Sequence, residues 1–196
     1  MSTPTTIGEI VARIEAVHAQ FADALALLSD VRLQAARLPG GRSGKDVLAH
    51  LTFWDQRLLH AIVPQAGAHA CRLAPPLIAD SPYNDQWADV VNERIFHINR
   101  GRDIATIKEE FARTCGELRQ AVGALTERDV FDPNGLAALL GEPCLPLLTG
   151  AYEHYADHVA DLQKSVVSQG ERSAACEIAA GDSFASLGPW RMHSRR

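Results

Sequence analysis

The sequence has few cysteines, few aromatic residues and no long hydrophobic run. Its 196 residues include 4 cysteines and 6% aromatic residues, and no two cysteines form a C-x-x-C pair, which argues against a zinc knuckle and a thioredoxin-type redox motif. Their wide separation predicts free thiols in a reducing compartment. No stretch approaches the roughly 18 apolar residues of a membrane helix, so we expect no membrane span. The cysteines are Cys71, Cys115, Cys144 and Cys176.

Basic charge is not in excess either. Lys and Arg number 19 against 24 Asp and Glu, a formal net charge of -5. The chain therefore lacks the positive field that holds a nucleic-acid backbone. Residues 1–6 carry no basic side chain and lead directly into a charged helical pattern, unlike a secretion signal. We expect a cytoplasmic protein that binds neither nucleic acid nor membranes.

Strand-like alternation is also absent, whereas apolar residues at helical spacing recur along the chain. One continuous stripe begins at Ile7 and predicts a first helix that ends before Pro39. Ser43 and Asp46 have the spacing of a capping box, which predicts a second helix over residues 44–63.

Two further amphipathic segments complete the pattern. The third helix is expected from Asn84 to Leu125, with a break or kink near Gly101, and the fourth from Leu147 to Val166. Four long amphipathic helices in a chain of this size predict an all-α protein, an antiparallel four-helix bundle.

Three segments lack a helical period. A proline-rich loop is expected over residues 64–83, and a second irregular stretch over residues 126–146, with a strong turn pattern at residues 132–135. After residue 168 the sequence turns to small and polar residues. We therefore expect one bundle domain over residues 1–168 and a flexible tail over residues 169–196.

Two histidines lie four residues apart in the fourth helix. His154 and His158 therefore lie on one helical face near the apolar stripe, which predicts that both point toward the bundle interior. His50 lies at the margin of the apolar face of the second helix, so a third imidazole is available from a neighbouring helix. Three histidines would leave coordination positions open for water or substrate, as in a catalytic metal site.

The alternative is that each of the three is a histidine at the edge of the core, satisfied by hydrogen bonds. The other histidines have no second histidine nearby at a comparable spacing, and we expect them at the surface or at core edges. They are His18, His60, His69, His97 and His193.

Two segments resemble the DinB-like superfamily of metal-binding four-helix bundles. Residues 45–51 read KDVLAHL, with Trp54 following, and are similar to the signature of that superfamily's second helix. Residues 154–158 read HYADH and are similar to its H-x-x-x-H motif. Residues 91–93, VNE, followed by a broken helix up to Glu127, resemble the ClbS/DfsB branch of the same fold. The resemblance covers roughly residues 7 to 168.

The resemblance implies that His50, His154 and His158 form the metal triad, with zinc or nickel as the divalent ion. Characterised branches of the superfamily include metal hydrolases and thiol-dependent transferases and isomerases that use low-molecular-weight thiols. The ClbS/DfsB branch is associated with protection against a reactive genotoxin by hydrolysis. The resemblance also implies a homodimer, although no feature of this sequence defines its interface.

A divalent ion held by three neutral imidazoles keeps its full charge, which lowers the pKa of a bound water or thiol toward neutrality. Carboxylates often orient such imidazoles through the second ring N–H. The candidates are Asp55, Asp157 and Asp161, for each of which the alternative is a solvated helix charge. A thiol transferase also needs a cationic anchor, and the nearest are Arg57, Arg100 and Arg102.

Two functions follow from these observations. The first is a metal-dependent enzyme, a hydrolase or a thiol transferase, that acts on a small organic molecule and serves in detoxification. The second is a non-catalytic bundle that binds a small molecule or protects against it, in which the histidines are structural or vestigial. Loss of His154 abolishes the activity in the first case and spares it in the second.

Overall fold

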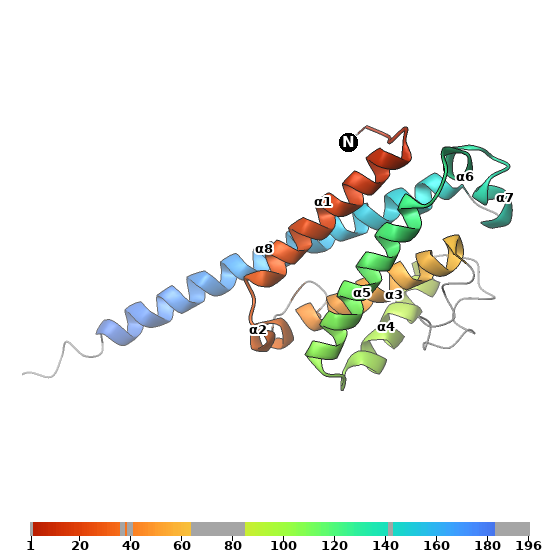
Figure 1. The fold of residues 1–196 in the computed structure, drawn as a ribbon. Helices are drawn as coiled ribbons and strands as arrows, with labels where there is room; N and C mark the ends of the chain where they lie inside the picture. Colours follow the sequence, from red (N-terminus) through yellow and green to blue (C-terminus); the bar gives the residue numbers. More distant parts are fainter. Residues whose placement is uncertain (1, 36–37, 39–40, 64–84, 141–142, 183–196) are drawn as a thin grey trace, which may run out of the picture.

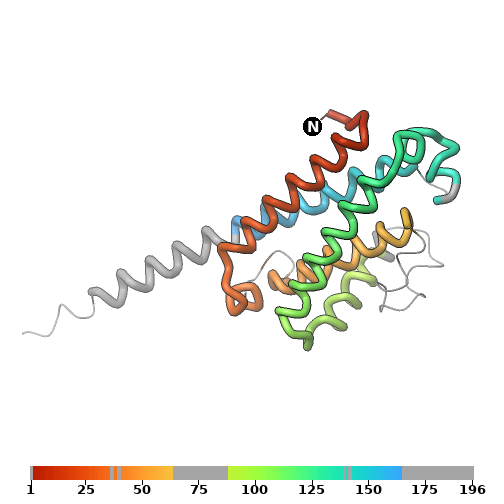
Figure 2. Tube along the Cα trace, viewed as in Figure 1, coloured from red at the N-terminus to blue at the C-terminus, as the bar shows by residue number. Residues whose placement is uncertain are grey.

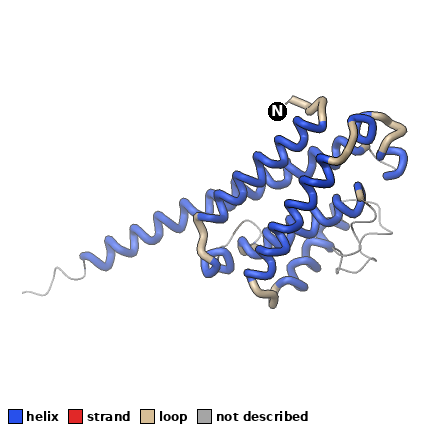
Figure 3. Tube along the Cα trace, in the orientation of Figure 1, coloured by secondary structure: helices blue, strands red, loops and turns tan. Residues whose placement is uncertain are grey.

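The computed structural model describes residues 2–35, 38, 41–63, 85–140 and 143–182, and the elements within them are all α-helices (Figures 1 and 3). Four long helices make up the bundle: α1 (Ile7–Ala26), α3 (Gly44–Ile62), α5 (Ile104–Gly123) and α8 (Cys144–Asp182). α1 packs against α8 and α5, and α3 packs against α5 and α8, so the four helices enclose one core (Figure 2). The predicted all-α four-helix bundle is confirmed.

An additional helix, α4 (Asp85–Asn99), packs on α3, and the chain reverses direction between α4 and α5 at the predicted break (Figure 1). Lys45, buried in the first turn of α3, holds this junction in place. Its Nζ atom donates hydrogen bonds to the carbonyl oxygens of Arg100 at 2.9 Å and Arg102 at 3.0 Å. These bonds satisfy two backbone carbonyl groups of the turn between α4 and α5, and they fix the reversal against α3.

The first helix is shorter than its apolar spacing predicts. α1 ends at Ala26, and a short helix α2 (Asp30–Ala35) follows in place of one continuous helix. Ser29 explains the break, because its hydroxyl accepts a hydrogen bond from the backbone N–H of Arg32 at 3.3 Å and so begins a new helical turn. The apolar spacing continues across the break, but Val31 is 75% exposed there.

The second predicted irregular stretch contains two short helices, α6 (Glu127–Phe131) and α7 (Leu136–Leu140), so this expectation was wrong. Thr126 begins α6 in a reciprocal capping box with Asp129. The predicted turn over residues 132–135 separates the two helices. Helices of five residues make less than two turns, which is too short to show a period of apolar residues, so the stretch lacked a helical pattern.

The last helix continues beyond its predicted end. α8 reaches Asp182, past the proposed domain boundary at residue 168, and the flexibility of residues 169–196 stays a prediction. The predicted loop over residues 64–83 lies outside the described residues, as do residues 183–196. Among the described helices, none combines the length and the apolar composition that crossing a bilayer requires.

Aromatic side chains at the centre of the bundle fix the face that α8 turns inward. The rings of Phe21 on α1, Phe111 on α5 and Tyr155 on α8 contact one another, with centroids 5.4 to 6.1 Å apart. Tyr155 is almost completely buried. Because it is anchored in the core, the neighbouring His154 is held at the edge of the core that faces α3.

Candidate metal centre

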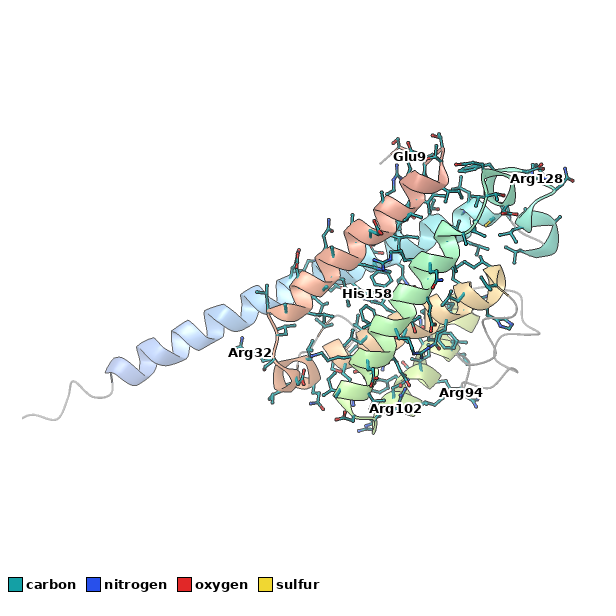
Figure 4. The ribbon with its side chains drawn as sticks, in the orientation of Figure 1. Glu9, Arg32, Arg94, Arg102, Arg128 and His158 are labelled. Atoms are coloured by element: carbon teal, nitrogen blue, oxygen red, sulfur yellow. The ribbon has the colours of Figure 1, made fainter. Side chains whose placement is uncertain are left out.

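Three histidines from two helices meet at the edge of the core. Nε2 of His50 on α3 lies 2.8 Å from Nε2 of His154 on α8, and that atom lies 3.2 Å from Nε2 of His158. All three side chains are half-buried. His158, labelled in Figure 4, lies in the part of α8 that packs within the bundle. The structure therefore brings together the three residues that the sequence places on two helices.

Local structure explains why His50 faces α8. Ser43 and Asp46 form the predicted capping box, which fixes the first turn of α3 and the orientation of the residues that follow. Leu48 and Leu51 are fully buried, so the core face of α3 is set on either side of His50. Its ring consequently lies at the margin of that face, next to the histidines of α8.

Burial keeps the three imidazoles in their neutral form. Loss of solvation, together with the neighbouring imidazoles of His154 and His158, lowers the pKa of His50 to about 3. Loss of solvation also lowers the pKa of His154 to about 4 and lowers the pKa of His158. The neutral imidazole is the form that coordinates a metal ion.

The arrangement of the ring nitrogens fits a cation. Each contact between two Nε2 atoms needs one donor and one acceptor, and a neutral imidazole has only one N–H. A cation needs only three lone pairs directed at one point. The three ligand atoms lie within 4.8 Å of one another, and zinc–nitrogen bonds of about 2.0–2.1 Å require only small side-chain rotations from there. The cluster is therefore compatible with a divalent ion.

A cavity of about 660 Å³ opens beside His50 and His154, between α3, α4 and α8. This volume lies within the range of small-molecule sites. Part of its wall is apolar, and includes Trp54, Leu58, Ala88, Pro146, Leu147 and Ala151. The polar groups at the wall include Arg57, Asn92 and Glu153. The cavity can hold an organic molecule with an apolar body and a few polar groups.

Asn92 connects α4 to the histidine cluster. Its side chain hydrogen-bonds to His50, which raises the pKa of that histidine and partly opposes the effect of burial. Its Oδ1 atom also accepts a hydrogen bond from Nε1 of Trp54 at 3.2 Å. A partner of this kind fixes the orientation of a metal-ligating imidazole. The sequence pattern did not assign this role to Asn92, because only the packing of α4 on α3 places it there.

Asp55, the first of the three candidate carboxylates, lies in the core. It is 3% exposed, and its Oδ2 atom accepts a hydrogen bond from the Tyr155 hydroxyl at 2.5 Å. Burial raises its pKa to about 7, and the hydrogen bond from Tyr155 opposes that rise. Its hydrogen-bond partner is thus a tyrosine, where the expectation was a metal-ligating histidine.

The other two carboxylates act on the cluster through charge. Asp157 is exposed at the rim of the cavity, and its negative charge raises the pKa of His154 and of His158. Asp161 also raises the pKa of His158 and forms an ion pair with Lys164 at 3.5 Å.

One of the three candidate cationic anchors lines the cavity. Arg57 lies at the cavity wall, with its guanidinium carbon 5.5 Å from the centre of the Trp54 ring. Arg102 instead forms an ion pair with Glu110 at 2.7 Å. Arg100 is exposed at the α4–α5 reversal. Of the three, Arg57 is therefore the one that lies at the cavity wall.

His18 lies close to other potential metal ligands, which the sequence did not indicate. Its ring lies half-buried on α1, 4.6 Å from the ring of Tyr155. Together with Asp55 and Cys115 it forms a second group of potential metal ligands. Loss of solvation lowers its pKa to about 4. The one hint in the sequence is its spacing of four residues from Ile14, which places it beside the buried stripe.

Fold and site together define a helical bundle with inward-facing side chains that form a candidate metal centre beside a cavity. The family model of the DinB superfamily matches residues 13–162, so the chain belongs to this superfamily. Membership suggests a helical fold that binds metal. The resemblance to the DinB-like superfamily is thus confirmed, whereas the likeness to the ClbS/DfsB branch stays a prediction.

The fold is also similar to the crystal structure of an uncharacterised protein from Escherichia coli UTI89. The two chains are 14% identical, with a TM-score of 0.66, and the match covers 87% of this chain and 98% of that chain. At a sequence identity this low, the match shows a similarity of fold and nothing about function. No curated protein matches the chain.

Proposed function

We propose that this protein is a metal-dependent enzyme in which His50, His154 and His158 hold zinc or nickel and the adjoining cavity receives a small organic substrate. The observation that carries the proposal is the convergence of three Nε2 atoms where two of the rings line the cavity. Three protein ligands leave further positions open to water or substrate, which is the arrangement of catalytic sites.

The electrostatics of the cluster support catalysis. When bound, a divalent ion supplies Lewis acidity that turns water or a low-molecular-weight thiol into a nucleophile near neutral pH. The three histidines are neutral and contribute no negative charge, so they leave that acidity undiminished. Several carboxylate or thiolate ligands would weaken the Lewis acidity of the ion, because their negative charge would offset its positive charge.

The residues around the cavity provide binding and orientation. Arg57 offers a guanidinium to an anionic group, such as a carboxylate of a thiol cosubstrate or of the substrate. Trp54 and the apolar wall contact the body of the substrate and exclude water from it. Asn92 holds the ring of His50 in place. Together these groups favour a small electrophilic molecule with an apolar part and an anionic group.

A metal-dependent conversion assay tests the proposal. The protein is stripped with a chelator, reloaded with zinc or nickel, and incubated with esters, lactones and epoxides, with and without cysteine or glutathione. We expect mass spectrometry to detect conversion by the reloaded protein only. Products that have gained water identify a hydrolase, and thiol adducts identify a transferase.

Two variants make the assay decisive. His154→Ala should abolish the conversion, whereas His97→Ala, which removes an exposed histidine on α4, should leave it unchanged. Conversion that survives chelation or the His154→Ala change contradicts a metal-dependent enzyme. Binding of these compounds without conversion, and equally with and without metal, supports the non-catalytic bundle instead.

A further inference from the structure

A second cluster of ligand-type side chains lies in the bundle, and it shares no residue with the three-histidine centre. His18 comes from α1, Asp55 from α3 and Cys115 from α5. The ligand atoms of the three side chains all lie within 4.8 Å of one another. The cluster thus joins three of the four long helices.

The carboxyl group of Asp55 is the most unusual member of the cluster. It is 3% exposed, and the ion pairs of the described residues do not include it. Its partner is the hydroxyl of Tyr155, at 2.5 Å. A buried carboxylate is costly unless a charge or a metal compensates it. A cation at this position would remove that cost.

The other two side chains supply the remaining donor types. Cys115 is a free thiol, and its Sγ atom lies 3.5 Å from the hydroxyl of Tyr155. His18 packs its ring against the same tyrosine. One nitrogen, one oxygen and one sulfur donor are the three ligand types that zinc accepts in proteins. Tyr155 contacts all three side chains, and its hydroxyl donates a hydrogen bond to Asp55, as an outer partner that orients a ligating carboxylate does.

We propose that His18, Asp55 and Cys115 form a second metal site, which takes zinc or a similar divalent ion and ties α1, α3 and α5 together. Binding forms a bond from the ion to Sγ and breaks the S–H bond of Cys115, with no change in oxidation state. The thiol proton goes to solvent, as does the proton of Asp55 where its carboxyl group is neutral. Asp55 binds as the carboxylate and His18 as the neutral imidazole.

Charge balance distinguishes this site from the three-histidine centre. One carboxylate and one thiolate cancel the two positive charges of the ion, so the occupied site is neutral and suited to burial. The site therefore stabilises the fold, whereas the three-histidine centre keeps a charged ion beside the cavity. Zinc bonds of about 2.0–2.3 Å require the three donors to move somewhat closer together than they stand.

Cobalt substitution tests the proposal, because it detects a thiolate ligand and the three-histidine centre has none. Cobalt(II) bound to a thiolate gives a sulfur-to-metal charge-transfer band in the near ultraviolet, and imidazole ligands give none. The full-length protein is stripped and titrated with cobalt alone. We expect the band in the wild type, and we expect it to persist in His50→Ala and in His154→Ala.

Two cysteines with described side chains, Cys115 and Cys144, provide a matched pair of variants. Cys115→Ala should lose the band, whereas Cys144→Ala, which removes a buried thiol outside the cluster, should keep it. No band at saturating cobalt in the wild type, or a band that persists in Cys115→Ala, overturns the second site. Either result leaves the three-histidine proposal untouched, because that centre has no sulfur ligand.

A measurement on the wild type alone covers the case in which Cys115→Ala does not fold. X-ray absorption at the zinc edge should show a sulfur neighbour at about 2.3 Å in addition to nitrogen and oxygen neighbours. A spectrum of the fully loaded protein with nitrogen and oxygen neighbours only overturns the proposal.

Discussion

Nε2 of His50 and Nε2 of His154 lie 2.8 Å apart, although the two residues are separated by 104 positions in the chain. The contact depends on the packing of α3 against α8. Two neutral imidazoles at this distance in a half-buried position gain little from each other, because only one hydrogen bond is shared between them. The shared metal ion that we propose would account for their convergence with His158.

Asn92 is expected to control metal affinity without being a ligand. Asn92→Ala removes the hydrogen bond that orients His50, and the loss of such an outer partner typically costs about 10–100-fold in metal affinity. Competition with a chromophoric chelator measures the change. Glu93→Gln, which alters the next residue at an exposed position, should bind zinc as the wild type does. Equal affinities for Asn92→Ala and the wild type would show that Asn92 does not position His50.

The stability of the metal-free protein should depend on pH through His50. Its pKa is about 3 in the folded protein, against an ordinary value of 6.5. As the pH falls below 6.5, the unfolded chain takes up a proton that the folded protein does not. The contribution of this group is therefore fully present above 6.5 and is lost progressively toward pH 3.

The variant His50→Gln isolates this contribution. Between about pH 7.5 and about pH 5 in a chelator, the wild type should lose about 1–2 kcal/mol more of its free energy of unfolding than the variant does. Urea denaturation gives both values. Asp55 acts in the opposite direction, since its pKa is raised to about 7, but it is present in both proteins and cancels in the difference. An identical pH dependence would mean that His50 titrates normally.

Lys45 is expected to stabilise the fold from a buried position. Lys45→Met keeps the apolar stem but leaves the carbonyl groups of Arg100 and Arg102 without their donor, at a cost of about 1–3 kcal/mol in the free energy of unfolding. Lys108→Met removes an exposed ion pair with Asp30 and should cost less than about 1 kcal/mol. Equal losses, measured by urea denaturation, would show that the buried hydrogen bonds have no special role.

Much of the bundle could be predicted from apolar spacing, and much of the histidine cluster from position along the helices. The i, i+4 spacing of His154 and His158 and the place of His50 beside a buried stripe determine which way each side chain points. These are properties of single helices, so they can be read from short stretches of sequence. The break at Ser29 could not be predicted in this way, because the apolar spacing passes through it unchanged.

Relationships between helices could not be predicted. His18, Asp55 and Cys115 come from three helices, and nothing in the spacing along one helix indicates which residue of another helix will face it. The role of Asn92 depends in the same way on the packing of α4 against α3. Periodicity shows which face of a helix is buried, whereas the partners of that face depend on the packing of the whole bundle.

The zinc content of the reconstituted and dialysed protein tests the central claim most directly. We expect His154→Ala and His158→Ala each to hold one ion fewer per chain than the wild type, because each removes a ligand of the same centre. Circular dichroism should show nearly unchanged helical content, since the centre lies at the edge of a bundle held by apolar packing. A wild type that holds no zinc after reconstitution, or folded variants that hold as much zinc as the wild type, would contradict the account.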